Sequence, residues 1–232
     1  MGDGSVLVVG GTGGIGREVA RHYHDKGHDV TITGRDHDKA TEIAAEIGDG
    51  VGALAFDLAE PETIADALAG LGPVSRLVLS SIARDNNPVR EYTIADAIYL
   101  TTMKLVGYTT TVHTLIDRLG NDSSVVLFGG RAKDRPYPGS TTVTTVNGGV
   151  SSLIRTLAIE LAPVRFNAIH PGIVGDSPFW EGKAAALDAT IERTPTGRLA
   201  TMADVVDATA FLLENQAMNG VNLYVDGGWM LL

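Results

Sequence analysis

A run of small residues near the start of the chain has the composition of a loop that binds phosphate. Five of its seven residues are glycine, and the run is Gly10, Gly11, Thr12, Gly13, Gly14, Ile15 and Gly16. The apolar residues 6–9 precede it, and a helical pattern over 17–28 follows. Glycine lets the backbone reach positive φ and lets a ligand approach without meeting a Cβ. The helix N-terminus beyond favours a phosphate through its free N–H groups and its dipole. A tight strand–helix turn without a ligand is the simpler alternative.

A second group with ligand chemistry is Arg35, which follows Gly34 at the end of the apolar run 29–33. In a dinucleotide-binding unit, an acidic side chain here would bond the ribose 2′-hydroxyl and repel a 2′-phosphate. A guanidinium instead binds phosphate bidentately, and Gly34 leaves room for it. This favours NADP(H), although the glycine loop has no basic residue before Gly14, so NAD(H) stays possible. A solvated surface arginine is the alternative.

The elements that must position these groups are alternating strands and helices. Apolar β-forming runs stand at 6–9, 29–33, 52–56, 76–80, 124–128, 164–169 and 221–225. Helical patterns stand at 14–26, 36–47, 61–69, 94–119, 140–161 and 202–214, with Asp36 as an N-cap. This order predicts one α/β domain over residues 1–232, a doubly wound parallel sheet with helices on both faces.

Residues 175–197 form the longest stretch without a clear strand. They follow the end of a strand, where α/β sheets bind ligands. We expect a lid on the substrate side, with Phe179 and Trp180 as its apolar part. Ordinary packing of these two aromatic side chains is the alternative.

Composition limits the partners. The chain has 232 residues, 44% hydrophobic, no cysteine and a formal net charge of −10. That charge argues against nucleic acid or an anionic membrane surface as partner. No apolar run approaches the roughly 20 residues of a membrane span. The first strand begins at once, so we expect no signal peptide, and the lack of cysteine fits a cytoplasmic protein. We expect a small-molecule substrate and no metal.

The chain resembles the short-chain dehydrogenase/reductase family over nearly its whole length. The matching pieces are Gly10-xxx-Gly14-Ile15-Gly16, Asp57, Leu157–Pro163 leading into Val164–Ile169, Pro171-Gly172, and Val225-Asp226-Gly227-Gly228. The resemblance implies a seven-stranded Rossmann sheet in the order 3-2-1-4-5-6-7 and a nicotinamide cofactor. It also implies a tetramer joined through the helix 140–161 and the C-terminal segment.

By this resemblance, several residues beyond the glycine loop contact the cofactor. They are Gly34, Arg35, Asp57, Leu58, Ser80, Ser81, Pro171, Gly172 and Ile173. Asp57 and Leu58 border the adenine, with Asp57 bonding its amino group. An aspartate that caps a loop turn is the alternative for Asp57.

The catalytic positions of the family are changed in this chain. The usual Asn-Asn-Ala-Gly is Ser80-Ser81-Ile82-Ala83, and the helix asparagine falls on Lys104. The serine falls on Gly129 or Gly130, and the Tyr-xxx-Lys pair falls on Val143 and Asn147. The chain therefore resembles a divergent branch that lacks the Asn-Ser-Tyr-Lys tetrad.

Hydride transfer to a carbonyl needs a proton donor, and Val143 cannot be one. Arg131, Lys133 and Ser81 remain as candidates, but we expect Lys104 or Tyr137. Lys104 lies on the helix that lines the nicotinamide end in the family, where burial would lower its pKa. Tyr137 lies on the loop above, where basic neighbours would favour its phenolate. A snorkelling lysine and a loop tyrosine between prolines are the alternatives, and His170 is expected to be structural.

These observations predict an NADP(H)-dependent oxidoreductase that acts on a small organic carbonyl or alcohol by a non-standard proton path. One alternative is a cofactor-binding sensor or regulator without redox turnover. Another is a cyclase or isomerase on the same scaffold. We also expect a homotetramer, because the helix 140–161 offers more apolar surface than one sheet face needs. The residues behind this expectation are Val150, Leu153, Ile154, Leu157, Leu161 and the apolar end Trp229–Leu232.

Overall fold

A seven-stranded parallel sheet in the order β3-β2-β1-β4-β5-β6-β7 forms the centre of the computed structural model. The strands are β1 (Ser5–Val9), β2 (Val30–Gly34), β3 (Gly52–Ala55), β4 (Val74–Leu79), β5 (Leu119–Phe128), β6 (Arg165–Pro171) and β7 (Asn222–Val225). The structure describes residues 4–83 and 85–231, and the side chains of 184–186 are outside this description. The predicted doubly wound sheet and its strand order are confirmed.

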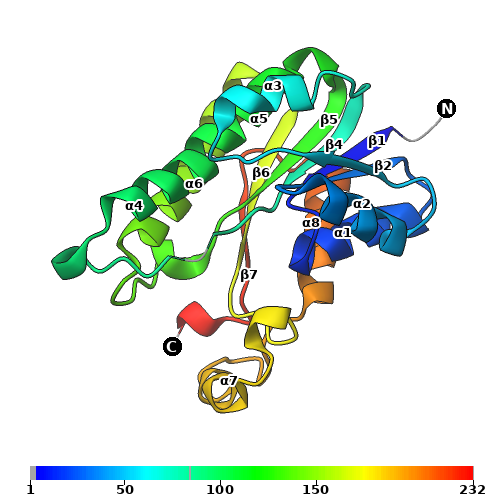
Figure 1. The fold of residues 1–232 in the computed structure, drawn as a ribbon. Helices are drawn as coiled ribbons and strands as arrows, with labels where there is room; N and C mark the ends of the chain where they lie inside the picture. The colour runs from blue at the N-terminus through cyan, green and yellow to red at the C-terminus, as the bar shows by residue number, and fades with distance from the viewer. Residues whose placement is uncertain (1–3, 84, 232) are drawn as a thin grey trace.

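Helices cover both faces of the sheet (Figure 1). One layer holds α1 (Gly14–Asp25), α2 (His37–Ile47) and α8 (Met202–Glu214). The other holds α3 (Ile64–Ala67), α4 (Ile94–Thr101), α5 (Tyr108–Leu115) and α6 (Thr141–Glu160). Alternate residues of each strand face opposite layers. In β1, Val6 and Val8 pack in the core beneath α1 and α8, whereas Leu7 and Val9 pack in the core beneath α5 and α6.

For three elements, the observed structure differs clearly from the predicted one. β5 starts at Leu119 because this residue already pairs with Val74 of β4, before a register shift that leads to the pair Arg76↔Ser124. The long helix predicted over 94–119 is interrupted by a π-helical segment, Thr102–Gly107, and ends in a 3₁₀ turn, Ile116–Arg118. The short helix after β3 is a 3₁₀ turn, Pro61–Thr63, followed by one turn of α3. Periodicity locates a helix but does not reveal an extra residue in one of its turns.

The predicted lid region 175–197 contains a 3₁₀ turn, Pro178–Trp180, and the helix α7 (Ala184–Ile191). In Figure 1, α7 lies beyond the lower end of β7, close to the C-terminus. The rings of Phe179 and Trp180 meet edge to face at 4.9 Å, and Lys183 Nζ lies 3.5 Å from the centroid of Phe179. Among the described helices, none combines the length and the apolar character that a membrane crossing requires.

Candidate functional site

The glycine loop folds tightly between β1 and α1. Gly10 has a φ of +85°, a conformation that favours glycine. A Cβ on Gly16 would lie 2.4 Å from the carbonyl oxygen of Gly10, so only glycine allows the first helical turn to approach the strand. The amides of Gly10 and Gly11 donate to Thr33 O at 3.2 and 3.1 Å, which ties the loop to β2.

The outer side of the same loop is open. A Cβ on Gly13 or Gly14 would meet no atom within 4 Å. The N-cap of α1, Gly13, makes no side-chain capping bond, and the first turn of the helix carries no acidic residue. The N–H groups at this helix end are therefore available to an anion, and the loop fits the pyrophosphate of a dinucleotide.

Arg35 lies at the end of β2, as the sequence predicts, and its side chain is exposed. Its Nη1 donates to the hydroxyl of Tyr99 on α4 at 3.3 Å. The expectation that Gly34 leaves free room is wrong in one detail, because a Cβ there would lie 2.6 Å from Thr12 Cγ2. Asp36 caps α2 by accepting from Lys39 N at 2.9 Å, so it does not compete for the guanidinium.

The other predicted cofactor residues lie along the same edge of the sheet. Asp57 Oδ1 accepts from Ala59 N at 2.9 Å, so this carboxylate does cap a turn. Its second oxygen has no hydrogen bond among the described residues, which leaves it available to a ligand. Leu58 is buried, whereas Ile173 is half-buried. Beyond Pro171, the amide of Gly172 donates to Val225 O at 2.9 Å, which joins the end of β6 to β7.

The two serines after β4 are held against the glycine loop. Ser80 Oγ donates to Val9 O at 3.0 Å. Ser81 lies so close to Gly10 that a Cβ on that glycine would be 2.6 Å from Ser81 Oγ. Ser80 and Ser81 therefore fix the junction of β1 and β4, where the strand order reverses and α/β sheets bind ligands.

Lys104 is buried at this junction, on the π-helical segment, with 4% of its surface exposed. Its Nζ donates to Ser81 O at 2.9 Å and to Tyr108 Oη at 3.0 Å. Tyr108 Oη in turn donates to Ser81 O at 2.8 Å. Burial lowers the pKa of Lys104 to about 7 and raises the pKa of Tyr108 well above its usual value. The alternative of a snorkelling lysine is wrong, because the ammonium does not reach solvent.

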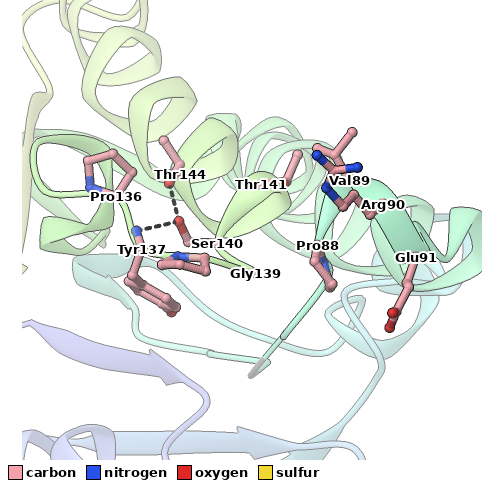
Figure 2. Close-up of a pocket in the computed structure, with 11 residues that line it drawn as sticks. Pro88, Val89, Arg90, Glu91, Pro136, Tyr137, Gly139, Ser140, Thr141 and Thr144 are labelled. Atoms are coloured by element: carbon pink, nitrogen blue, oxygen red, sulfur yellow. Dashed lines mark hydrogen bonds between the residues drawn. The ribbon is translucent and has the colours of Figure 1, made fainter.

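Tyr137 is at a different place, on the loop between β5 and α6, and is 53% exposed. Its amide donates to Ser140 Oγ at 3.0 Å, and Figure 2 shows its ring turned away from that contact. It lines a cavity of about 570 Å³ between this loop and the segment before α4. The other lining residues are Pro88, Val89, Arg90, Glu91, Pro136, Pro138, Gly139, Ser140, Thr141 and Thr144. Lys104 is not among them.

The basic neighbours of Tyr137 do not serve its hydroxyl, contrary to expectation. Arg131 is buried, lies 3.0 Å from Asp226 and 2.9 Å from Asp134, and stacks over Tyr224 at 4.0 Å. Lys133 Nζ donates to Tyr224 Oη at 3.0 Å. These two cations therefore link β7 to the loop that follows β5. Their carboxylate and aromatic partners hold them away from Tyr137.

His170 on β6 lies against Gly129, one of the two positions on which the resemblance places the family's serine. A Cβ on Gly129 would lie 2.4 Å from His170 Cε1. His170 Nδ1 accepts from Gly130 N at 3.1 Å, and Nε2 lies 2.8 Å from Asn222 Oδ1. Burial lowers the pKa of His170 to about 4, so the ring is neutral near pH 7 and Nε2 is the donor. The structural role predicted for His170 fits these contacts.

Asn147 stands where the resemblance places the family's lysine, and it was not predicted as a site residue. It lies one helical turn after Val143 on α6, and a Cβ on Gly130 would be 2.9 Å from its Nδ2. It is 6% exposed, yet its carboxamide makes no hydrogen bond to any described residue. The spacing of four residues from Val143 was the available signal, because it places both side chains on one helix face.

Comparisons with known proteins agree with this geometry. The sequence profile described as enoyl-(acyl carrier protein) reductase matches residues 10–230. L-xylulose reductase and 3-oxoacyl-[acyl-carrier-protein] reductase, both from Bos taurus, are each 30% identical and share 97% of this chain, with 95% and 97% of their own length covered. The solved MalC reductase/Diels-Alderase from Malbranchea aurantiaca is 26% identical with a TM-score of 0.90, over 98% of this chain and 96% of its own.

These matches span nearly the whole chain and include the glycine loop and the junction of β1 and β4. The chain therefore belongs to the short-chain dehydrogenase/reductase family, whose members are oxidoreductases that use NAD(P)(H).

Proposed function

We propose that the protein is an NADP(H)-dependent oxidoreductase that interconverts a small organic carbonyl compound and its alcohol without the tyrosine of the family. The observation that carries this proposal is the buried ammonium of Lys104 beside Ser81, at the strand-order reversal. A cation in a dry site stabilises a developing alkoxide, and no phenol stands at Val143 to do so.

The residues that would hold the cofactor follow the edge of the sheet. The open glycine loop takes the pyrophosphate, and Arg35 takes the 2′-phosphate. Asp57 offers its free carboxylate oxygen to the adenine amino group. When bound, the nicotinamide supplies or accepts the hydride. A charged contact to the 2′-phosphate contributes about 1.5–3 kcal/mol, which is roughly tenfold or more in affinity.

Lys104 is our first choice as proton source. With a pKa of about 7 it is partly protonated at neutral pH, which suits general acid–base chemistry. Two of its three N–H donors go to Ser81 and Tyr108, and the third has no partner among the described residues. Asn147 would polarise the carbonyl group of the substrate through its free side-chain amide. It would not be the proton source, because an amide cannot deliver a proton. Tyr137 is the second proton candidate, because its exposed hydroxyl lines the cavity.

The test begins with calorimetric titration of NADPH and NADH, followed by turnover on a panel of aldehydes and ketones. The kcat of Lys104→Met and Tyr137→Phe is then measured separately, with Tyr92→Phe as control. Loss of the general acid lowers kcat by roughly 10²–10⁴. If both variants stay within a few-fold of wild type, neither residue is the donor. If NADPH binds but no substrate turns over, a cofactor-binding sensor or regulator becomes the better account.

A cyclase or isomerase on this scaffold is the second candidate. Two observations favour it: the tetrad is replaced, and a relative that shares nearly the whole chain is named a reductase/Diels-Alderase. Under this alternative, the cofactor site orients the substrate and no hydride is transferred. The discriminating measurement is the redox state of the cofactor: product that forms without any change in the NADPH absorbance supports the cyclase.

We further propose a cytoplasmic homotetramer in which 175–197 closes over a small-molecule substrate. The apolar residues of α6 from which the tetramer was predicted do not form an exposed surface. Val150, Ile154 and Leu157 are buried in the core, and Leu153 and Leu161 pack against it. Trp229 and Met230 are half-buried, Leu231 is exposed, and Leu232 lies outside the described residues.

The surface that supports assembly is instead on α4 and the segment after it. Ile94, Ile98 and Val106 are 67%, 61% and 47% exposed. Residues four apart share a helix face, and exposed apolar stripes of this kind mark interfaces.

A further inference from the structure

We infer that Tyr99 is a positioning residue for Arg35, which it holds ready to receive the 2′-phosphate of the cofactor. The inference rests on the proposed preference for NADP(H). Its starting point is the hydrogen bond from Arg35 Nη1 to Tyr99 Oη, 3.3 Å long, which joins the end of β2 to α4 across 64 positions of sequence.

Within the described residues, Tyr99 is the only hydrogen-bond or ion-pair partner of the Arg35 guanidinium. The nearby basic residue Arg17 is already paired, with Glu46 Oε2 at 2.5 Å. Asp36, next in sequence to Arg35, is engaged in capping α2. An exposed arginine without a partner samples many rotamers, and ordering it on binding opposes affinity. The contact with Tyr99 limits that freedom before the ligand arrives.

A phenol suits this role better than a carboxylate would. The guanidinium carries five N–H donors, and one bond to Tyr99 leaves the others for phosphate oxygens. The neutral phenol does not cancel the charge of Arg35 and does not repel the phosphate, as a carboxylate would. Tyr99 is itself restrained, because its ring packs against the core beneath α5 and α6.

The experiment titrates NADPH, NADH and 2′,5′-ADP into wild type, Tyr99→Phe, Arg35→Ala and the double variant by calorimetry. Tyr99→Phe keeps the packed ring and removes only the hydroxyl. We expect it to weaken NADPH and 2′,5′-ADP about 2–10-fold, because the Arg35 side chain must then be ordered on binding, with NADH changed less than twofold. In the Arg35→Ala background the same substitution has no further effect, because Tyr99 acts only through Arg35.

Tyr92→Phe is the matched control, since Tyr92 is an exposed tyrosine just before the same helix and makes no hydrogen bond to a described residue through its hydroxyl. If Arg35→Ala weakens NADPH and Tyr99→Phe does not, or tightens it, the inference is wrong while the cofactor proposal stands. Equal weakening of NADPH and NADH by Tyr99→Phe also overturns it, since that is a general structural loss. If wild type binds both cofactors equally and Arg35→Ala changes nothing, the cofactor proposal fails and the inference with it.

Discussion

Gly129 lies directly against the ring of His170, and a Cβ on this glycine would be 2.4 Å from both Cε1 and Nδ1 of the imidazole. The ring also accepts from the next amide, Gly130 N, and its Nε2 lies within hydrogen-bond distance of Asn222 on β7. The imidazole therefore occupies the space that a side chain at Gly129 would need.

A side chain at Gly129 should accordingly destabilise the protein. Gly129→Ala forces its methyl into the buried His170 ring, and overpacking of this kind costs about 1–3 kcal/mol in the free energy of unfolding. Urea unfolding measures it. Gly120→Ala, within β5, is the matched control, because a Cβ there meets nothing within 4 Å, and it should stay within about 0.5 kcal/mol of wild type. Equal stability of the two variants would contradict this packing.

Lys104 should make stability depend on pH. Its pKa is about 7 in the folded protein and about 10.4 in the unfolded chain, so between these values the unfolded chain binds more protons. Stability therefore rises with pH across this window, by about 2 kcal/mol from pH 7 to pH 9, and the contribution of Lys104 levels off below about pH 6.

The measurement is the free energy of unfolding of wild type and Lys104→Met at pH 7, 8 and 9. The methionine variant should lack this rise, because it has no ammonium to bury. Lys39→Met, at an exposed lysine, serves as control and should keep the wild-type slope. Parallel pH curves for all three proteins would show that Lys104 is not desolvated.

Thr201 should contribute to stability as the N-cap of α8. It accepts from Asp204 N at 3.2 Å, and Asp204 Oδ2 accepts from Thr201 N at 2.8 Å, which completes a capping box. Thr201→Ala is expected to cost about 1 kcal/mol. Thr93 precedes α4 but makes no side-chain capping bond, so Thr93→Ala should cost much less. Thermal unfolding of the two alanine variants decides whether the cap is formed in solution.

The exposed stripe on α4 should control assembly. If Ile98 is covered by a second copy of the chain, Ile98→Asp buries an unpaired charge there and weakens association. Sedimentation velocity at micromolar concentration is expected to show a tetramer for wild type and a smaller species for the variant. Glu60→Gln, a change at an exposed residue outside the stripe, should leave the mass unchanged. A monomeric wild type would refute the assembly proposal.

Short-range patterns in the sequence were sufficient to predict the fold. Apolar runs such as Val6–Val9, separated by helical periods, define strands that are buried on both faces, and right-handed crossovers leave few possible orders for them. The tight turn of the glycine loop was equally predictable, because its conformation depends on neighbouring residues. The absence of a phenol at Val143 was also visible in the sequence, once the flanking motifs set the alignment.

Contacts between distant residues needed the tertiary structure. The burial of Lys104 depends on Ser81, 23 positions away, and on the π-helical segment that turns its side chain inward. The expectation that basic neighbours serve Tyr137 did not foresee that Arg131 pairs with Asp226, which follows the last strand.

The apolar residues of α6 illustrate the same limit. A sequence shows how many apolar residues a helix has, but not how many the neighbouring elements cover. Leu157 and Ile154 are buried within the monomer, whereas Ile159 on the same helix and Ile94 and Ile98 on α4 are exposed. The sequence by itself thus determined the parallel sheet and its strand order, since these follow from short-range pattern, and it predicted a phosphate-binding loop and the loss of the family's tetrad. Only the tertiary structure decided which polar groups are buried and which of them have a hydrogen-bond or ion-pair partner, because those properties depend on residues brought together by folding.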